Sequence, residues 1–338
     1  ALYLVTLAPG LYTEDAGDFQ TAALTLGIPH PSGYPGYVML ANLWSRVAGH
    51  SAFAVNVFSA LAGAVAVVLL FQVARELKVR ILPALAGALA LAVSLTWWRQ
   101  SIVAEVYSLN GVAVMGMLWL AIRWYNTKRL VFLYSLAFVY GLALTNHYML
   151  QALAPAVAVF SIACAPSEFK RFRTWGGIIA YFILGLLPYL FLPLRSRMHP
   201  KLNWLDTENF SHLGYVLKYN APTSLKTSLD TLHYLATVAG GFVAELGALV
   251  FLAGLVGLGW LLWNERRLGW FVVAYVLLGT IGVACVITQG APVTAFVAWF
   301  LNILYVPVYA LWCVLAAYTL HNIREWLRVV FGSTWLGT

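Results

Sequence analysis

Charged residues are scarce in this sequence. Asp, Glu, Lys and Arg together make up 9% of its 338 residues, whereas about 25% is usual in a soluble domain. Apolar residues make up 62%, and several apolar runs reach about 20 residues, the length that spans a bilayer core. So little charge cannot cover a water-soluble surface, which excludes a soluble enzyme. We predict an all-α, polytopic transmembrane helical bundle.

Cysteine and the common nucleotide and metal motifs are also rare or missing. The three cysteines, Cys164, Cys285 and Cys313, lie inside apolar runs without CxxC spacing. We expect them to be small buried side chains, with no disulfide framework and no cysteine metal site. The sequence contains no GxGxxG, Walker A or HExxH motif, so nothing in it indicates a dinucleotide, P-loop or zinc-protease site.

The polar breaks between apolar runs predict about ten spans, of which the first is incomplete. Residues 1–9 are too short to span and resemble the end of a helix. The chain has no initiator Met and no charged signal-peptide start, so we expect it to begin inside a longer protein. The complete spans are predicted at 53–74, 81–98, 105–123, 130–146, 148–165, 175–193, 241–263, 269–288 and 296–320.

The basic residues predict the orientation of these spans. Turns at every second crossing hold 13 of the 20 Lys and Arg residues and four of the 12 acidic residues. We place those turns in the cytoplasm, with a net charge of +9, and assign −1 to the opposite face. The total of +8 then reflects insertion in a plasma or inner membrane, and no nucleic-acid partner is expected. The basic turns lie at 75–80, 123–129, 170–173, 266–267 and 324–328.

The outer face carries two long segments, about 10–52 and 194–240, which are rich in Pro, Gly, Asn, His and acidic residues. The first contains Glu14, Asp15 and Asp18. If the residues that follow are helical, Asp15 and Asp18 share one face at i, i+3. Their function can be to cap the helix, with Thr13 or Asp15 as the cap. It can also be to act as a general base on a hydroxyl or to hold a divalent metal.

Residues 30–36, HPSGYPG, cannot be helical because they contain two prolines and two glycines. Such a stiff loop next to the membrane is typical of a cavity wall, although His30 alone can equally be a structural histidine. Residues 37–50 form an amphipathic stretch that predicts an interfacial helix on the outer leaflet.

Further polar groups are predicted to reach the same outer vestibule. Glu105 opens an apolar span, where an ionisable group is costly unless it has a partner, and Asn146, His147 and Tyr148 form an outer turn. Arg195 follows directly on a span, where it can either snorkel to the interface or bind a phosphate. Asn203 and Trp204 offer a hydrogen bond and a stacking face for a sugar.

These segments resemble a family of GT-C-type membrane glycosyltransferases related to the protein O-mannosyltransferases. The resemblance rests on TEDAGDFQTAALTLGIPHPSGYPGY (13–37), AEVYSLN (104–110), the Asn–His turn at 146–147, and LPLRS followed by NW (192–204). It covers roughly residues 8–205. Relatives often carry a soluble domain of helical repeats after the membrane part, and we expect this chain to lack one.

The resemblance implies a fold like that of polyprenyl- or dolichyl-phosphate-sugar-dependent transferases, with an acid of the first outer loop as base and inversion at the sugar. By position, Asp15 is the best candidate base, Asp18 the second and Glu14 a weaker one. Arg195 would hold the lipid phosphate. The other residues expected to bind substrate are His30, Tyr34, Glu105, Tyr107, His147, Asn203 and Trp204.

We therefore predict a catalytic membrane module at 1–205, followed at 206–338 by an outer loop and C-terminal helices. The predicted partners are a polyprenyl-phosphate sugar, the bilayer, a protein or glycan acceptor on the extracytoplasmic face, and other membrane proteins. Two alternatives stay open, a catalytically silent subunit of a larger complex and a lipid or sugar transporter. A divalent metal also stays open, because Asp15, Asp18 and His30 do not define a ligand number.

Overall fold

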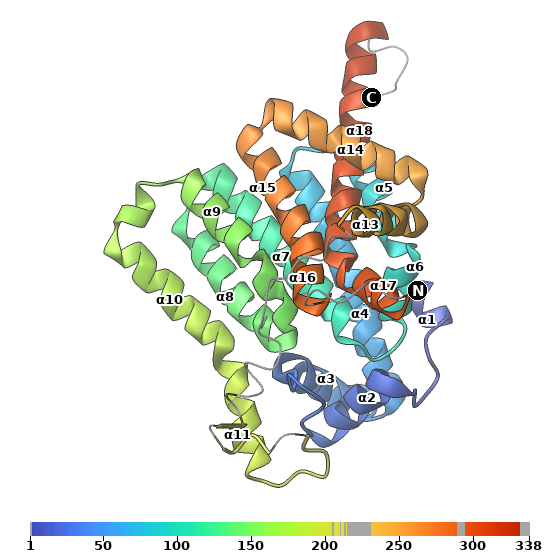
Figure 1. The fold of residues 1–338 in the computed structure, drawn as a ribbon, viewed down its shortest axis with the longest axis vertical. Coiled ribbons are helices and arrows are strands. Elements are labelled where there is room, and N and C mark those ends of the chain that lie inside the picture. Colours follow the sequence, from blue (N-terminus) through green and yellow to red (C-terminus); the bar gives the residue numbers. More distant parts are fainter. Residues whose placement is uncertain are drawn as a thin grey trace.

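The computed structural model describes residues 2–204, 206–209, 211–212, 214, 231–288 and 295–331. The remaining residues, among them Lys218, Lys226 and Asp230 of the second predicted outer segment, lie outside the described part. Helices make up nearly all the regular structure of the described residues (Figure 1). The one isolated bridge recorded there joins Ile28 to Asn203.

The N-terminal half of the chain forms fourteen helical elements. They are α1 (Leu2–Val5), α2 (Glu14–Thr25), α3 (Pro35–Val47), α4 (Ala52–Glu76), α5 (Ile81–Ala92), α6 (Leu95–Ser101), α7 (Val106–Thr127), α8 (Leu130–Asn146), η1 (Tyr148–Leu153), α9 (Ala154–Cys164), η2 (Glu168–Lys170), α10 (Phe172–Leu186), η3 (Leu187–Leu190) and α11 (Phe191–Ser196).

The described C-terminal part begins at Thr231. Its elements are α13 (Thr231–Leu246), α14 (Ala248–Asn264), α15 (Arg266–Leu277), the π-helical turn η4 (Leu278–Gly282), α16 (Val283–Thr288), α17 (Ala295–Leu304) and α18 (Val306–Phe331).

Four helical stretches in the described part are long and apolar enough to cross a membrane: α4, α7, Phe172–Ser196 and α18. Two bent pairs, α5 with α6 (68°) and Val238–Leu246 with α14 (115°), raise that number to six if each pair is one span. The all-α, polytopic bundle is thus confirmed. The prediction of about ten spans stays a prediction.

Three predicted spans are interrupted in the structure, one by a contact distant in sequence and two beside a glycine or a proline. The span at 81–98 breaks at Ser94, because Glu245 accepts hydrogen bonds from the Thr96 amide and hydroxyl and so starts a new helix, α6. The span at 241–263 breaks at Gly247, which has a φ of +79°. The span at 296–320 breaks at Tyr305, just before Pro307, which has no amide hydrogen to continue a helix.

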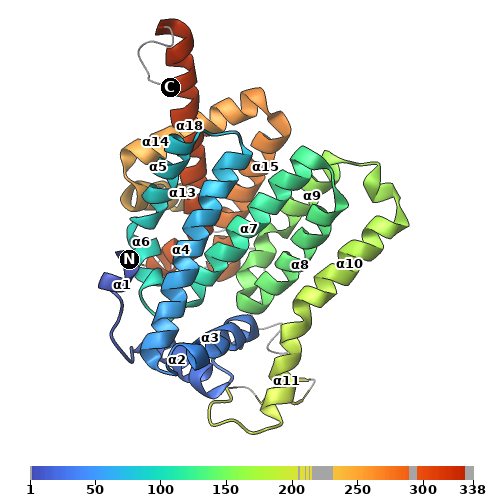
Figure 2. The same cartoon turned by 180° about the vertical axis from the view of Figure 1, so that it is seen from behind.

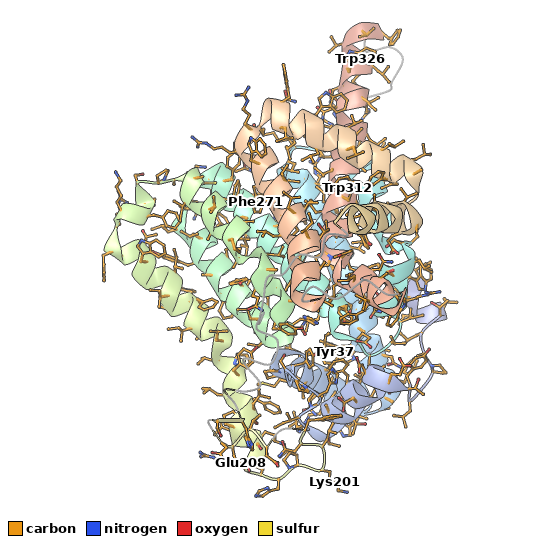
Figure 3. All side chains as sticks on the ribbon, in the orientation of Figure 1. Tyr37, Lys201, Glu208, Phe271, Trp312 and Trp326 are labelled. Atoms are coloured by element: carbon orange, nitrogen blue, oxygen red, sulfur yellow. The ribbon has the colours of Figure 1, made fainter. Side chains whose placement is uncertain are left out.

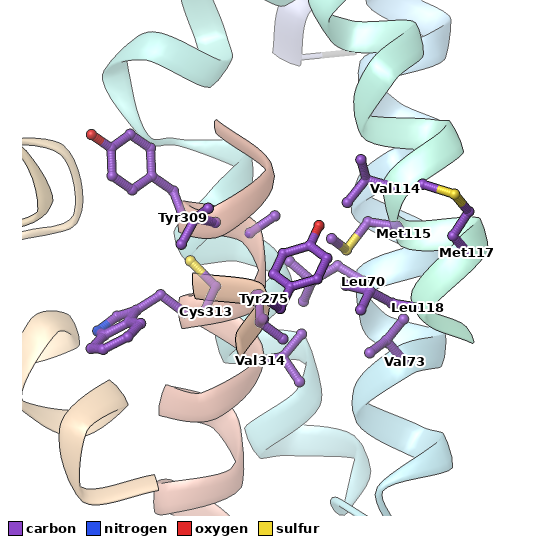
Figure 4. Packing of buried hydrophobic residues seen from close by; sticks show 14 of the residues in the cluster. Leu70, Val73, Val114, Met115, Met117, Leu118, Tyr275, Tyr309, Cys313 and Val314 are labelled. Atoms are coloured by element: carbon purple, nitrogen blue, oxygen red, sulfur yellow. The ribbon is translucent and has the colours of Figure 1, made fainter. Parts of the chain in front are cut away.

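The core lies where α4, α5, α7 and α18 pack together. Figure 4 shows Leu70 of α4, Met115 of α7 and Val314 of α18 gathered around Tyr275 of α15. Cys164 and Cys313 are free and buried, as predicted. The side chain of Cys285 lies outside the described part.

The two ends of the bundle differ in what they carry. Helices α2 and α3 lie together at one end, close to α11, and α14 and the last turns of α18 lie at the other (Figures 1 and 2). We call the first the loop end, made of α2, α3, α11 and residues 146–148. We call the second the basic end, made of the turns at 75–80, 123–129, 168–173 and 265–267 and the end of α18. The predicted separation of charge thus corresponds to two ends of one bundle.

Candidate active site

Helix α2 is held against its neighbours by buried amides. Asn42 Nδ2 of α3 donates to the carbonyl of Ala23 at 2.7 Å. Gln20 Nε2 donates to Asn56 Oδ1 of α4 at 2.8 Å. Phe19, which is fully buried, fills the space between α2 and α3. Because buried amides are costly to leave unpaired, these contacts fix α2 and its acidic residues relative to the bundle.

Glu14 and Asp15 lie in the first turn of α2, and both are exposed. Thr13 occupies the N-cap position, but its side chain makes no capping hydrogen bond, so the capping interpretation finds no support there. The negative charge of Asp15 acts on both Tyr34 and Glu105. Asp15 therefore belongs to the same electrostatic environment as these two residues.

Asp18 lies one turn further along α2 and is bonded on both oxygens. Its Oδ2 accepts from His30 Nδ1 at 2.7 Å and from the His30 amide at 3.0 Å, and its Oδ1 accepts from Trp204 Nε1 at 3.3 Å. Burial acts to raise the pKa of Asp18. The opposing effects are stronger: the hydrogen bonds from His30, the charge of His30 and the hydrogen bond from Trp204 together hold that pKa below its usual value. Asp18 is thus an ionised carboxylate engaged in holding its neighbours.

Residues 30–34 form the expected non-helical loop, and α3 begins at Pro35, two residues earlier than predicted. Proline is well suited to the first position of a helix, because its fixed φ fits and its missing amide hydrogen would have no partner there. Gly36 faces Thr145 so closely that a Cβ would lie 2.5 Å from Thr145 Oγ1. The glycine therefore lets α3 pack against the end of α8.

Tyr34 lies at the centre of a group of rings. Its ring centroid lies 5.0 Å from that of Phe19, 5.1 Å from that of His30 and 5.9 Å from that of His147. Burial raises the pKa of Tyr34, and so do Tyr148 and the charges of Asp15, Glu105 and Asp18. Tyr34 is thus a neutral hydroxyl surrounded by three carboxyl groups.

His147 lies in the turn after α8 and is buried. Asn146 holds this turn by donating to the carbonyl of Val106 and to Asn110 Oδ1. His147 Nδ1 accepts from the Met149 amide, so a neutral ring carries its proton on Nε2. Burial, and then the charge of His30, lower the pKa of His147 to about 4, and the ring is neutral at physiological pH. It packs against the rings of Tyr107 and Tyr148.

Glu105 precedes α7 and is half-buried. Its backbone is fixed by Ser59 of α4, whose hydroxyl exchanges hydrogen bonds with the Glu105 amide and carbonyl. Tyr37 OH lies 3.3 Å from the same hydroxyl. Burial, and then the charges of Asp15 and Glu14, raise the pKa of Glu105 to about 8. Glu105 is thus largely protonated at neutral pH.

Arg195 of α11 reaches the C-terminal end of α2. Its Nε donates to the carbonyl of Leu26 at 2.7 Å and its Nη2 to that of Thr25 at 3.1 Å. The last carbonyls of a helix have no partner within it and carry partial negative charge. Arg195 thus closes α2, and its guanidinium retains further N–H groups for a ligand.

The two predicted outer segments meet in one structure. The Ile28 amide donates to the carbonyl of Leu202 at 2.8 Å, and the Trp204 amide donates to the carbonyl of Ile28 at 3.2 Å. Asn203 Nδ2 donates to Ser196 Oγ and to Asp206 Oδ1. Trp204 leaves 56% of its surface exposed. Its indole therefore offers a free face beside the Asp18–His30 pair.

The structure thus brings the predicted residues together from several segments. One group contains Asp15, Asp18, His30, Tyr34, Glu105, Tyr107 and His147. Three further residues border this group: Arg195, Asn203 and Trp204. Figure 3 shows Tyr37 between α3 and the bundle, with Lys201 and Glu208 at the tip of the loop end. Ser59 and Tyr37, which position Glu105, were missed, because a serine inside an apolar run and a tyrosine at a helix start carry no distinctive signal.

The described residues contain no group of three or more His, Cys, Asp or Glu side chains suited to one metal ion. Asp18 and His30, two of the three residues considered for a metal, are bonded directly to each other. Nothing in this part of the chain therefore defines a metal ligand set.

Comparisons with known proteins support the resemblance. Residues 15–168 match the family described as protein O-mannosyl-transferase TMEM260 N-terminal domain. The chain is similar to membrane O-mannosyltransferases. It is 31% identical over 214 residues to the mouse protein O-mannosyl-transferase TMEM260, a match that covers 61% of this chain and 30% of the mouse protein.

A second relative, the Dictyostelium discoideum protein O-mannosyl-transferase tmem260, is 23% identical over 226 residues, which cover 61% of this chain and 28% of that protein. The chain thus matches less than a third of the length of each relative. The predicted resemblance to O-mannosyltransferase-like membrane glycosyltransferases is confirmed. The matched region 15–168 contains Asp15, Asp18, His30, Glu105 and His147, whereas Arg195, Asn203 and Trp204 lie beyond it.

Proposed function

We propose that this chain is the membrane part of a glycosyltransferase of the protein O-mannosyltransferase type. It moves a sugar from a polyprenyl-phosphate donor to a hydroxyl of a protein or glycan acceptor. The observation that supports this most directly is Asp15. It is an exposed carboxylate in the first turn of α2, one turn before the bonded Asp18, at the end of a transmembrane bundle that a lipid-linked substrate can reach.

In the proposed reaction, the acceptor oxygen attacks C1 of the sugar while the bond from C1 to the phosphate oxygen breaks. The electron pair of that bond goes to the departing lipid phosphate, and the acceptor proton goes to Asp15. Attack on the face opposite to the phosphate inverts the configuration at C1. Asp15 thus serves as a general base, a role that typically contributes a factor of about 10² to 10⁴ to the rate.

The surroundings of the acids support Asp15 over its neighbours. Both oxygens of Asp18 already accept hydrogen bonds. Glu105 is largely protonated at neutral pH, because burial and the nearby acids raise its pKa. Asp15 is exposed and lies in the first turn of α2, so its carboxylate is open to a substrate.

The other residues are assigned to the donor. The N–H groups that Arg195 does not use on α2 are available to the phosphate. The exposed indole of Trp204 offers a stacking face to the sugar, and Asn203 Oδ1 can still accept a hydrogen bond, because both N–H groups of Asn203 are already bonded. Tyr107 and His147 line the site. Because the acids lie opposite the basic turns, we assign the site to the extracytoplasmic face.

The test is sugar transfer from a polyprenyl-phosphate sugar by the purified chain in lipid nanodiscs. Asp15→Asn should lower the transfer rate by about 10² to 10⁴ without lowering the unfolding temperature, because Asp15 is exposed. Glu14→Gln, in the adjacent exposed acid, is the matched control and should retain most of the rate.

Full activity of Asp15→Asn would show that another group takes the proton. Movement of the sugar lipid across the bilayer without covalent transfer would favour the transporter alternative. If a complex that contains this chain is active and keeps its activity with Asp15→Asn, the silent-subunit alternative is favoured.

A further inference from the structure

The function of Asp18 is not explained by general base catalysis. Its Oδ2 accepts from both the amide and the ring of His30, and its Oδ1 accepts from Trp204. An oxygen that must take a proton from an acceptor hydroxyl would first have to give up one of these bonds. The structure therefore indicates that Asp18 acts on its neighbour His30.

His30 is fixed on several sides. Its ring packs on Phe19 at 5.2 Å and on Tyr34 at 5.1 Å between centroids, and its carbonyl accepts from the Gly33 amide at 2.9 Å. Its side chain is 22% exposed. Within the described part of the chain, Nε2 makes no hydrogen bond, whereas Nδ1 is bonded to Asp18. The ring thus presents one nitrogen to a ligand.

We propose that His30 contacts the phosphate of the lipid donor through Nε2, and that Asp18 is the positioning residue that fixes the ring. This rests on the proposed function and assigns the phosphate a second donor besides Arg195. The pair resembles a common arrangement in which a carboxylate on one imidazole nitrogen orients the other toward the substrate.

The charges around the site explain why a second donor is needed. Glu14, Asp15 and Asp18 are all on α2, and a phosphate that approaches this helix is repelled by their charge. Arg195 directs two of its nitrogens to the carbonyls of α2. His30 Nε2 is open to the site and can donate a hydrogen bond to the anion, while Asp18 holds the ring at Nδ1.

The proton balance of the step is simple. The departing phosphate oxygen receives the electron pair of its bond to C1, and His30 Nε2–H donates a hydrogen bond to that oxygen. His30 neither gains nor loses a proton in this step. The acceptor proton still goes to Asp15, so the two residues have separate effects, His30 on the binding of lipid phosphate and Asp15 on transfer.

The experiment measures binding of farnesyl phosphate, which carries the lipid and phosphate without a sugar, to the chain in nanodiscs, with farnesol as the uncharged control. His30→Asn keeps a donor near the position of Nδ1 but has no Nε2. Because hydrogen bonds to charged groups are stronger than neutral ones, His30→Asn should weaken binding about tenfold or more. His30→Gln, which places an N–H near the position of Nε2, should retain more of the affinity.

Asp18→Asn should also weaken binding, because a neutral amide holds the ring at Nδ1 less firmly than the carboxylate does. Asp15→Asn should bind farnesyl phosphate at least as tightly as the parent chain, because it removes a charge that repels the phosphate, while it loses transfer. Farnesol binding should be unchanged in all variants, and unfolding temperatures show whether each variant is folded.

Unchanged farnesyl phosphate binding by a folded His30→Asn would overturn the proposal. Equal losses of affinity in His30→Asn and His30→Gln would also overturn it, because they indicate a structural role. A His30 variant that binds farnesyl phosphate normally but no longer transfers sugar would overturn it too, because this indicates that His30 takes the acceptor proton. A parent chain that neither binds farnesyl phosphate nor transfers sugar overturns the proposed function itself, and this inference with it.

Discussion

The acidic residues at the two ends of the bundle have different partners. At the basic end, Glu76 pairs with Arg123 at 3.0 Å, Glu168 with Arg171 at 2.9 Å, and Glu325 with Arg80 at 2.9 Å. Glu265 accepts from Tyr125 OH at 2.6 Å.

At the loop end, the ion pair recorded in the described part is that of Asp18 with His30. Asp15 and Glu105 have no Lys or Arg partner there.

This difference separates acids that hold the bundle together from acids that are available to a substrate. Two acids that we predicted on the outer face, Glu245 and Glu208, are also hydrogen-bonded within the protein, like the acids of the basic end. Glu245 of α13 accepts from the amide and hydroxyl of Thr96, each at 2.7 Å, and so links two bent helix pairs. Glu208 accepts from Ser196 Oγ. The bonding of a carboxylate, more than the face on which it lies, indicates its function.

The largest effect on stability is expected from Glu105→Gln, and it depends on pH. The folded state raises the pKa of Glu105 from 4.5 to about 8, so the protonated form stabilises the fold below pH 4.5. That contribution is lost as the pH rises toward 8, because the unfolded chain ionises first. A glutamine at position 105 does not ionise, so the variant does not lose stability in this way as the pH rises. Allowing for solvent screening of this half-buried carboxyl, Glu105→Gln should gain about 2–4 kcal/mol on the parent between pH 5 and pH 8.5.

The measurement is the unfolding temperature of the parent and Glu105→Gln in detergent at several pH values. Glu168→Gln, in an acid at the basic end, is the control and should change the unfolding temperature by about 2 °C or less at each pH. A difference between Glu105→Gln and the parent that stays constant from pH 5 to pH 8.5 would contradict the assignment of a half-buried, protonated carboxyl.

The next effect is expected at the basic end, from Glu76→Gln. Glu76 is 18% exposed, and Arg123 stacks on Trp119 and Phe132, so the substitution leaves a partly buried guanidinium without its anion. We expect a loss of about 1–2 kcal/mol of stability, less than for a fully buried pair. The transfer rate per folded molecule should stay within about twofold. A large loss of rate without a loss of unfolding temperature would break the comparison between the two ends.

How much of the fold the sequence predicts differs between spans. The span at 130–146 coincides with α8, because Arg129 and His147 bound an uninterrupted apolar run. The spans at 241–263 and 296–320 are apolar across Gly247 and Tyr305, so composition predicts one helix where the structure has two. Apolarity indicates that a segment is in the membrane, but the direction of a helix depends on glycine, proline and capping contacts.

The same holds for the candidate site. The spacing of Asp15 and Asp18 predicts a common helix face, and the motif marks His30, Glu105 and His147 as site residues. The different surroundings of the two aspartates depend on contacts distant in sequence. Asp18 is bonded to His30 twelve residues away and to Trp204 186 residues away. Arg195, predicted for a phosphate, also closes α2 170 residues away, which no local pattern indicates.

The smallest effect is expected from Glu168→Gln, also at the basic end. Its partner Arg171 is 66% exposed and lies three residues away in the same turn, and exposed pairs of this kind contribute at most about 0.5 kcal/mol. The unfolding temperature should change by about 2 °C or less, and the change should shrink further at high salt. Arg171→Gln is the matched control and should behave alike. A loss as large as that of Glu76→Gln would show that burial does not determine how much these pairs stabilise the bundle. Acids at the basic end would then also be candidates for a function, as Asp15 is.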